Sequence, residues 1–318
     1  MASTTEGLVV RIDRKVIHVE IGLDVVPCTV RGRFFEGQDD DPESRPVAVG
    51  DRVRVEVGGE RGAIEEVLER RSRIARPRPR DPRNWQVIAA NVELLVIVAS
   101  VRQPTTRPGL IDRMLVTAES EGIEPLIVLN KIDLVTDAEA NAFAAPWRAL
   151  GYRVVATSVP QARGIEELRA AMAGRVAMLL GHSGVGKSSL LAALDPAIAA
   201  RIGGLVAEGT KMARGAHTTT SASMHRLAFG GHLIDTPGVR EFGLPPMEPH
   251  DLAHWFRELA PLVKQCRYAT CTHDHEPNCA VKDAVTAGKV HPDRIATYRK
   301  LLDELKGGGE RMARHDSF

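Results

Sequence analysis

The sequence predicts a multidomain α/β protein, and three features of its pattern carry that prediction. Short β-rich runs separated by glycine-containing turns fill residues 1–69. Apolar runs then alternate with helical segments in a βα rhythm through residue 242, which is typical of a mostly parallel sheet covered by helices. A helical region with three of the four cysteines follows at 243–318. We therefore expect three domains, at 1–69, 85–242 and 243–318, with a linker at 70–84.

The composition excludes two broad classes of protein. Lys and Arg total 42 against 41 Asp and Glu, so the whole chain is not a polybasic nucleic-acid binder, and any such binding must come from local patches. No stretch approaches the roughly 20 apolar residues that span a bilayer, and residues 1–7 lack the pattern of a signal peptide. We expect a cytoplasmic protein that does not contact a membrane.

The N-terminal region is expected to form a small β-barrel of about five strands. Its β-rich runs include Leu8–Ile12, Val16–Ile21, Val25–Phe35 and Val53–Val57, which suit an all-β module of that size. The segment Val49–Asp51, followed by an alternating Val/Arg strand, favours an OB-type barrel. Barrels of this type commonly bind oligonucleotides, so we expect an RNA-binding domain.

A basic, proline-rich stretch follows the barrel. Its prolines exclude a continuous helix, and its charge is almost all positive. A solvated linker is the simplest interpretation. The neighbouring barrel favours RNA contact as an alternative, because arginines serve both phosphate contact and base stacking. The candidate RNA-contact residues are Arg70, Arg71, Arg73, Arg76, Arg78, Arg80 and Arg83.

The pattern Gly-x4-Gly-Lys-Ser at Gly181–Ser188 predicts a phosphate-binding loop. It follows the apolar run Val176–Leu180 and opens a helix over Ser188–Leu194, which is the context that such a loop requires. Glycines let backbone N–H groups close around the β-phosphate, Lys187 neutralises phosphate oxygens, and the Ser188 hydroxyl ligates Mg²⁺. The expected nucleotide contacts here are Gly181, His182, Ser183, Gly184, Val185, Gly186, Lys187, Ser188 and Ser189.

A base-reading motif, Asn130–Asp133, follows another apolar run. The Asp133 carboxylate can accept from both N1–H and the exocyclic amine of guanine, whereas adenine presents an acceptor at N1. An ATP-using kinase is thereby disfavoured. Asn130 is expected at the N7 or O6 side of the base, with the Lys131 stem over its plane. The remaining expected contacts are Ile132 and the backbone amide of Ser158 in Thr157-Ser158-Val159.

Two later segments complete the predicted site. Asp235, at the end of an apolar run, is expected to hold Mg²⁺ through water, and the Gly238 N–H is expected to meet the γ-phosphate.

The residue that usually positions the attacking water is missing. Val239 stands after Gly238, where a glutamine with that role is usual. His217 is our candidate for that task, against the alternative of an exposed histidine with a docking role. One of Thr218, Thr219 and Thr220 is expected to complete the Mg²⁺ shell, although such a triplet also suits an exposed strand.

These motifs stand in a rotated order. The base-reading motif precedes the phosphate loop, and Asp235–Gly238 follows both, whereas a Ras-like domain carries the phosphate loop first and the base reader last. The sequence therefore predicts a circularly permuted Ras-like P-loop GTPase domain. Because the Asp235–Gly238 segment leads directly into the C-terminal region, that region is placed to receive the nucleotide state.

Three thiols and one imidazole lie within fourteen residues of the C-terminal region. In a reducing compartment this clustering favours metal binding over disulfides, and the set matches a closed tetrahedral Cys3His zinc site. So short a segment cannot bury a core, so the metal would hold it together. His275 is a competing ligand, and reduced cysteines that cluster by chance are the other alternative. The expected ligands are Cys266, Cys271, His273 and Cys279.

Taken together, the motifs resemble those of the ribosome small subunit-dependent GTPase A family, also called RsgA or YjeQ. The resemblance covers nearly the whole chain, including the barrel, the permuted domain and the zinc domain. A hydrophobic residue in place of the catalytic glutamine, here Val239, is a family trait. The chain departs from the family pattern at His182, where Asn is common, and at Thr157-Ser158-Val159, where Ser-Ala is more usual. The matching segments are Asn130–Asp133, Gly181–Ser189, His217–Thr220, Asp235–Gly243 and the Cys/His cluster.

The resemblance implies a late assembly factor of the 30S ribosomal subunit that binds 16S rRNA, hydrolyses GTP when the subunit stimulates it, and then leaves. We expect a monomer that takes GTP or GDP, Mg²⁺ with GTP and one structural Zn²⁺, in which rRNA arranges His217 around the attacking water. Two alternatives stay open. The protein is a GTP-regulated RNA-binding placeholder with incidental turnover, or it is a permuted GTPase that acts on the large subunit.

Overall fold

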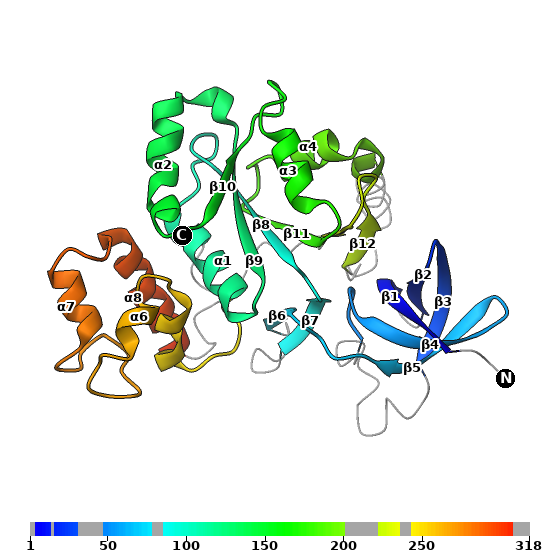
Figure 1. Cartoon of the computed structure of the whole chain (residues 1–318), viewed down its shortest axis with the longest axis horizontal. Coiled ribbons are helices and arrows are strands. Elements are labelled where there is room, and N and C mark those ends of the chain that lie inside the picture. The colour runs from blue at the N-terminus through cyan, green and yellow to red at the C-terminus, as the bar shows by residue number, and fades with distance from the viewer. Residues whose placement is uncertain are drawn as a thin grey trace, which may run out of the picture. The chain divides into compact units, whose positions relative to one another are not determined.

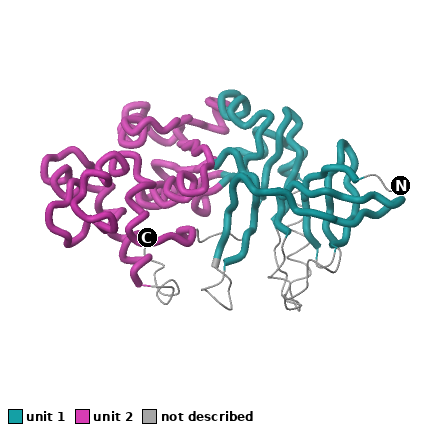
Figure 2. Tube along the Cα trace, turned by 60° about the horizontal axis from the view of Figure 1, so that its bottom comes forward, with its two compact units in different colours: residues 1–95, 165–179, 187–241 teal, residues 96–164, 180–186, 242–318 magenta. Residues whose placement is uncertain are grey.

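The computed structural model describes residues 4–13, 16–30, 47–77, 85–200, 222–235 and 243–307. The chain forms two compact units, each assembled from segments far apart in the sequence (Figure 2). One unit comprises 1–95, 165–179 and 187–241, and the other comprises 96–164, 180–186 and 242–318. Among the described residues, no helix has the length and apolar character that a membrane crossing requires.

Five strands close into a barrel at the N-terminus (Figure 1). Neighbouring strands pair antiparallel except β3 and β5, which pair in parallel, and β1 also pairs with β4. The cyclic order β1-β2-β3-β5-β4 confirms the predicted OB-type barrel. Alternate side chains fill its interior, where Val9, Val19 and Ile64 have no exposed surface. The strands are β1 (Thr4–Asp13), β2 (Val16–Ile21), β3 (Asp24–Val30), β4 (Arg52–Gly58) and β5 (Arg61–Val67).

The stretch expected to be a linker contains a strand. β6 (Arg73–Pro77) pairs antiparallel with β7 (Trp85–Ala90) in a separate two-stranded sheet. The described residues of this stretch, 70–77, form no helix, which agrees with the expectation from its prolines. The sequence pattern did not predict that β6 pairs with β7, because residues 78–84 separate the two strands in the chain.

Three strands of the second unit carry the base-reading motif. They are β8 (Leu94–Ser100), β9 (Glu124–Asn130) and β10 (Arg153–Ala156), in the order β8-β9-β10, and β9 pairs with β10 in parallel. β8 is buried along its whole length, as expected of a strand covered on both faces. The accompanying helices are α1 (Pro108–Ser120), the short η3 (Ile132–Leu134) and α2 (Asp137–Ala149).

The first unit continues from the barrel into a second run of strands, in the order β11-β13-β12-β1. β11 (Val176–Leu180) pairs in parallel with β13 (His232–Asp235), and β12 (Ser223–Arg226) forms a hairpin with β13. β12 also pairs with β1 of the barrel, so the barrel adds a strand to this sheet. The helices of this part are α3 (Ile165–Met172) and α4 (Lys187–Leu194).

The C-terminal region is helical, as predicted, and packs on α1 within the second unit. The side chains of Phe256, Tyr298 and Leu301 join Val116 of α1 in one core, where the rings of Phe256 and Tyr298 meet edge to face at 5.5 Å. The elements are η4 (Pro249–Trp255), α6 (Ala260–Val263), α7 (Ala280–Thr286) and α8 (Pro292–Lys306), the last ending at Gly307.

Candidate functional site

Asn130 joins the base-reading motif to the phosphate loop. It ends β9, is 2% exposed, and donates from Nδ2 to the carbonyl of Val185 at 2.9 Å. Its Oδ1 accepts from the buried Thr157 hydroxyl at 3.0 Å. Both polar atoms of the amide are therefore held by the protein, and the two motifs, which the sequence separates by about fifty residues, are in contact.

Lys131 lies along the same loop. Its backbone has φ = +61°, which few non-glycine residues adopt and which directs the chain sharply into η3. The Nζ atom donates to the carbonyl of Gly184 at 2.6 Å and to that of Gln103. The stem of Lys131 is thus anchored across the phosphate loop, where a base plane can lie against it.

The Ser158 hydroxyl donates to Oδ1 of Asp133 at 2.6 Å and so orients the carboxylate that we expect to read the base. The Ser158 amide, which the sequence analysis assigned to the base, donates to the carbonyl of Arg163 at 3.0 Å, and the Arg163 amide donates back to Ser158. Ser158 therefore acts on the motif through its side chain, which orients Asp133, and its backbone amide is already used within the protein.

Two glycines of the phosphate loop stand where no side chain fits. A Cβ on Gly181 (φ = +151°) would lie 2.3 Å from the carbonyl oxygen of Val98, and one on Gly186 (φ = +96°) would lie 2.4 Å from Nδ2 of Asn130. The loop backbone therefore lies closer to β8 and to Asn130 than any side chain would allow, so both positions require glycine. Bare N–H groups at the start of a helix form the cradle that a phosphate needs.

The loop runs directly into α4, which begins at Lys187. Burial lowers the pKa of the Lys187 ammonium, and the negative charge of Asp235 opposes this effect. Lys187 and Asp235 therefore influence each other electrostatically within the first unit. The side chains of Ser188 and Ser189 are exposed. The expected contacts His217, Thr218, Thr219, Thr220 and Gly238 lie outside the described residues.

The four predicted metal ligands converge. Nδ1 of His273 lies 3.5 Å from Sγ of Cys266 and 3.3 Å from Sγ of Cys279, and the two sulfurs lie 3.9 Å apart. With Cys271 included, all four ligand atoms are within 4.8 Å of one another. His275, the competing ligand, stays outside this group with a 78% exposed side chain. The group can hold a metal ion.

The electrostatics of the cluster fit a bound cation. Burial raises the pKa of Cys271 to about 12 and also raises the pKa of Cys279, whereas it lowers the pKa of His273. His273 is thus kept neutral, which is the form that binds metals. A divalent cation would supply the positive charge that turns such buried thiols into thiolates.

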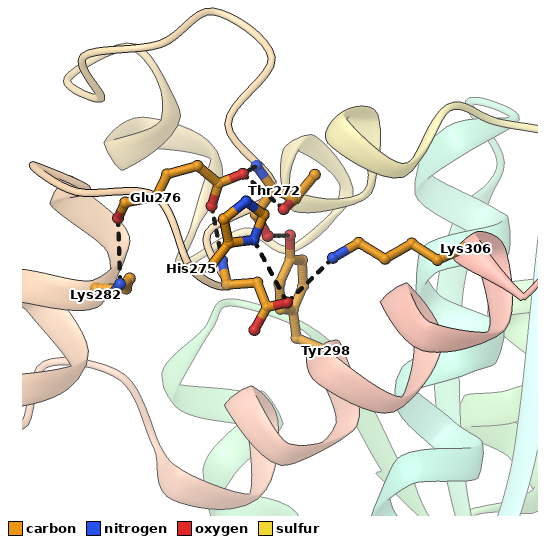
Figure 3. Close-up of polar contacts among 7 residues, drawn as sticks. Thr272, His275, Glu276, Lys282, Tyr298 and Lys306 are labelled. Atoms are coloured by element: carbon orange, nitrogen blue, oxygen red, sulfur yellow. Dashed lines mark hydrogen bonds and ion pairs between the residues drawn. The ribbon is translucent and has the colours of Figure 1, made fainter.

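A carboxylate organises the loop that carries these ligands (Figure 3). Glu276 accepts from the amide and the hydroxyl of Thr272, both at 2.7 Å, and from the amide of Asp274 at 3.1 Å. Partial burial would raise the pKa of Glu276, but these hydrogen bonds lower it to about 2. Tyr298 of α8 donates to the carbonyl of Thr272 at 2.8 Å, which ties the loop to the domain core.

The candidate RNA-contact arginines differ in their surroundings. Arg70 donates to both carboxylate oxygens of the fully buried Asp51, at 2.7 and 2.8 Å, so it stabilises the end of the barrel. Arg71 and Arg73 are exposed, and Arg76 is half-buried. Arg78, Arg80 and Arg83 lie outside the described residues.

A buried ionic cluster that the sequence did not predict lies between α1 and the C-terminal region. Arg294 of α8 donates to Asp112 of α1 and to both oxygens of Glu258. Trp147 donates to the same oxygen of Asp112 at 2.8 Å. Burial opposes the charge of Arg294, but the carboxylates of Glu258 and Asp112 raise its pKa above the ordinary value. No local pattern could have predicted this cluster, because 182 residues separate Asp112 from Arg294.

Comparisons with known proteins point to one family. The RsgA GTPase family model matches residues 67–245. A protein of Gemmatimonas aurantiaca named small ribosomal subunit biogenesis GTPase RsgA is 38% identical over 96% of this chain and 99% of its own. One of the same name from Chromohalobacter salexigens is 42% identical over 81% of this chain and 75% of its own.

Two solved structures share the fold along nearly the whole chain. The crystal structure of YjeQ from Thermotoga maritima is 32% identical with a TM-score of 0.76, and covers 96% of this chain and 99% of its own. The structure of YloQ, described as a circularly permuted GTPase, is 25% identical with a TM-score of 0.71, and covers 96% of each chain.

Proposed function

The chain belongs to the RsgA GTPase family and is a GTPase of ribosome biogenesis, and from this premise we propose that it assists late maturation of the 30S subunit. In this proposal the GTP form binds 16S rRNA on the subunit, and hydrolysis to GDP releases it. The protein acts as a monomer in the cytoplasm. The names of the relatives, which specify the small subunit, support this choice over the large subunit.

The proposed guanine reader is Asp133, and the observation that carries the proposal is its fixed position. The Ser158 hydroxyl holds one carboxylate oxygen at 2.6 Å, and Asn130 ties the same motif to the phosphate loop at 2.9 Å. A carboxylate held in this way can accept from N1–H and the exocyclic amine of guanine together. We assign Lys131 and Ile132 to the same base-binding segment.

The proposed phosphate contacts are the backbone of Gly181–Gly186, Lys187 and the hydroxyls at the start of α4. Lys187 balances the negative charge that develops on the transferred phosphoryl group. Ser188, Asp235 through water and one threonine of Thr218–Thr220 would hold Mg²⁺, which would neutralise negative charge on the phosphates. Gly238 would meet the γ-phosphate through its N–H.

The proposed catalytic deficit lies after Gly238, where Val239 offers no group to orient water. We assign this task to His217, arranged by 16S rRNA when the protein binds the subunit, and turnover without the subunit is then slow. A His217→Ala variant that kept full subunit-stimulated turnover would remove His217 from the mechanism.

The proposed division of labour follows the chain. Residues 1–69 form the RNA-binding barrel, 70–84 the basic linker, 85–242 the GTPase domain and 243–318 a domain held by one structural Zn²⁺. The Cys3His donor set supports zinc over oxygen-preferring cations. Among the described linker arginines, Arg71 and Arg73 suit RNA contact best because they are exposed. Arg70 is held by Asp51, and Arg76 is half-buried.

The deciding experiment is GTP hydrolysis by the purified protein alone, with 30S subunits and with 50S subunits. We expect strong stimulation by 30S alone. Stimulation by 50S alone would assign the protein to the large subunit. If neither stimulates while 30S is still bound, the protein is a GTP-regulated RNA-binding placeholder.

A further inference from the structure

The barrel is continuous with the strand that carries Asp235. Arg11 of β1 lies opposite Ser223 of β12, and Ser223 lies opposite Asp235 at the end of β13. Neighbouring strands in a sheet are about 4.8 Å apart, so two steps place the backbone of Arg11 about 10 Å from that of Asp235. The barrel is therefore part of the sheet that presents this residue.

One barrel side chain holds the other end of the same hairpin. Oε1 of Glu20 on β2 accepts from Nη2 of Arg226 at 2.7 Å and lies 2.9 Å from Nε2 of His232. Arg226 also donates to the carbonyl of Gly22 at 2.6 Å. The side chains of Glu20 and His232 are only 13% and 18% exposed, whereas that of Arg226 is 44% exposed, so solvent screens the His232 contact less than the Arg226 contact.

The two residues that Glu20 contacts are partners across the hairpin. Arg226 ends β12, His232 begins β13, and their backbones lie opposite each other. A single carboxylate thus fixes both strands at one position. Because β13 is four residues long, Glu20 acts on the first residue of the strand whose last residue is Asp235.

The start of β13 has little freedom to move independently of these contacts. A Cβ on Gly231 would lie 2.6 Å from the carbonyl oxygen of Arg175, so the backbones are in close contact there. Leu233 and Ile234 are 2% and 1% exposed, and they pair with β11. A displacement imposed at His232 is therefore passed along a packed, hydrogen-bonded strand.

We infer that Glu20 is a positioning residue for Asp235, and that the barrel is in this way part of the magnesium-dependent nucleotide site. The inference rests on the Mg²⁺ role proposed above for Asp235. By thermodynamic linkage, a ligand that displaces β2 would change Mg²⁺-dependent nucleotide binding, and the nucleotide would change affinity for that ligand by the same factor. A barrel that merely sits on the same chain would show no such coupling.

The test follows release of a fluorescent, non-hydrolysable GTP analogue from the full-length protein over a range of free Mg²⁺, and in EDTA. The variants are Glu20→Gln, Arg226→Met and Asp235→Asn. The matched control is Glu66→Gln, which removes a carboxylate whose arginine partner, Arg54, lies on the neighbouring barrel strand. This set separates the Glu20 contact from general effects of losing a barrel ion pair.

We expect Glu20→Gln and Arg226→Met to raise, by about 3- to 10-fold, the Mg²⁺ concentration at which half of the GTP analogue is retained. This effect is smaller than the 10- to 100-fold loss that is typical when a group touching a metal ligand is removed. Release in EDTA should stay unchanged, and Glu66→Gln should match the wild type. If Glu20→Gln does not fold, Arg226→Met carries the test.

Three results would overturn the inference in distinguishable ways. If Asp235→Asn raises the Mg²⁺ requirement while Glu20→Gln and Arg226→Met match the control, Glu20 is not a positioning residue and the role of Asp235 stands. If Asp235→Asn itself leaves the requirement unchanged, the proposed Mg²⁺ assignment is wrong and the positioning role is wrong with it. Faster release in EDTA with no change in the Mg²⁺ requirement would make Glu20 merely structural.

Discussion

Single residues of the proposed nucleotide site bind one another. Asn130 and Lys131 donate to carbonyl groups of the phosphate loop, and Ser158 donates to Asp133. Each bond fixes a side chain that would otherwise lose rotamer freedom on binding, so less conformational entropy is lost when a ligand arrives. The same bonds make base recognition depend on the geometry of one carboxylate.

Replacing Asp133 should therefore change the base that the protein prefers. In Asp133→Asn, an amide donor faces the exocyclic amine of guanine, and two charge-assisted hydrogen bonds are lost. At about 1.5–3 kcal/mol for a hydrogen bond to a charged group, GTP affinity should fall by about 100-fold or more. Xanthosine triphosphate, which carries a carbonyl at that position, should bind better to the variant than to the wild type. Fluorescence titration with both nucleotides measures this.

Ser158→Ala is the matched control for that experiment. It removes the hydroxyl that orients Asp133 but leaves the carboxylate, so GTP affinity should fall by about 5- to 10-fold, equivalent to about 1 kcal/mol. The preference for guanine should remain. If Asp133→Asn bound GTP as well as Ser158→Ala does, Asp133 would not be the base reader.

At the scale of elements, two features organise the loop between α6 and α7. The Cys3His group draws its ends together, and Glu276 closes its centre through three hydrogen bonds. Cys279 also caps α7, because its sulfur accepts from the amide of Lys282 at 3.5 Å. Metal, loop and helix should therefore gain or lose order together.

Metal removal should unfold this element without abolishing nucleotide binding. A strong chelator should release one zinc ion per chain and lower the thermal stability of the C-terminal region, as seen by mass spectrometry and hydrogen exchange of α7 and α8. Glu276→Gln should keep the ligands and lower zinc affinity by about 10-fold, as is typical of groups that orient metal ligands. Zinc affinity equal to that of the wild type would show that Glu276 does not support the site.

The strands that the sequence predicted are the buried, apolar ones. The strands β8, β9 and β11 are apolar runs because they are buried, and glycine and lysine spacing marks the loop that follows β11, so these were predicted. β12 has the sequence Ser-Met-His-Arg and is only partly buried, so it carries no apolar or alternating signal. The ligand set of the metal centre was local in sequence, whereas Glu276 was not identified because a surface glutamate has no distinguishing pattern.

At the scale of the whole molecule, two of the contacts that join domains are ionic and distant in sequence. Arg294 to Asp112 links the C-terminal region to α1, and Glu20 to Arg226 links the barrel to the hairpin, 206 residues further along the chain. Periodicity and motif spacing report on local structure, so neither link was predictable. Both were found only once the elements were assembled.

Arg294→Met should destabilise the second unit strongly. It leaves Asp112 and Glu258 buried without their cation, which typically costs about 3–5 kcal/mol. When Asp112 is also replaced by Asn and Glu258 by Gln, the protein should regain part of the lost free energy of unfolding. Arg163→Met, which removes an exposed ion pair with Asp137, should cost no more than about 1 kcal/mol. Urea unfolding of the four proteins measures these differences, and equal losses in the two single variants would show that the cluster is not a buried network.

The link between the barrel and the sheet should weaken in acid. Burial alone would raise the pKa of Glu20, but hydrogen bonds from Arg226 and His232 lower it below the ordinary value of 4.5. The folded protein therefore binds fewer protons at this site than the unfolded chain does, so the contribution of Glu20 to stability is present above about pH 4.5 and is lost as pH falls through the folded pKa. The difference in unfolding midpoint between the wild type and Glu20→Gln should accordingly be largest near neutral pH and shrink below about pH 4.5. A difference that stayed constant from pH 7 to pH 3 would mean that Glu20 contributes through shape alone, and not through its charge.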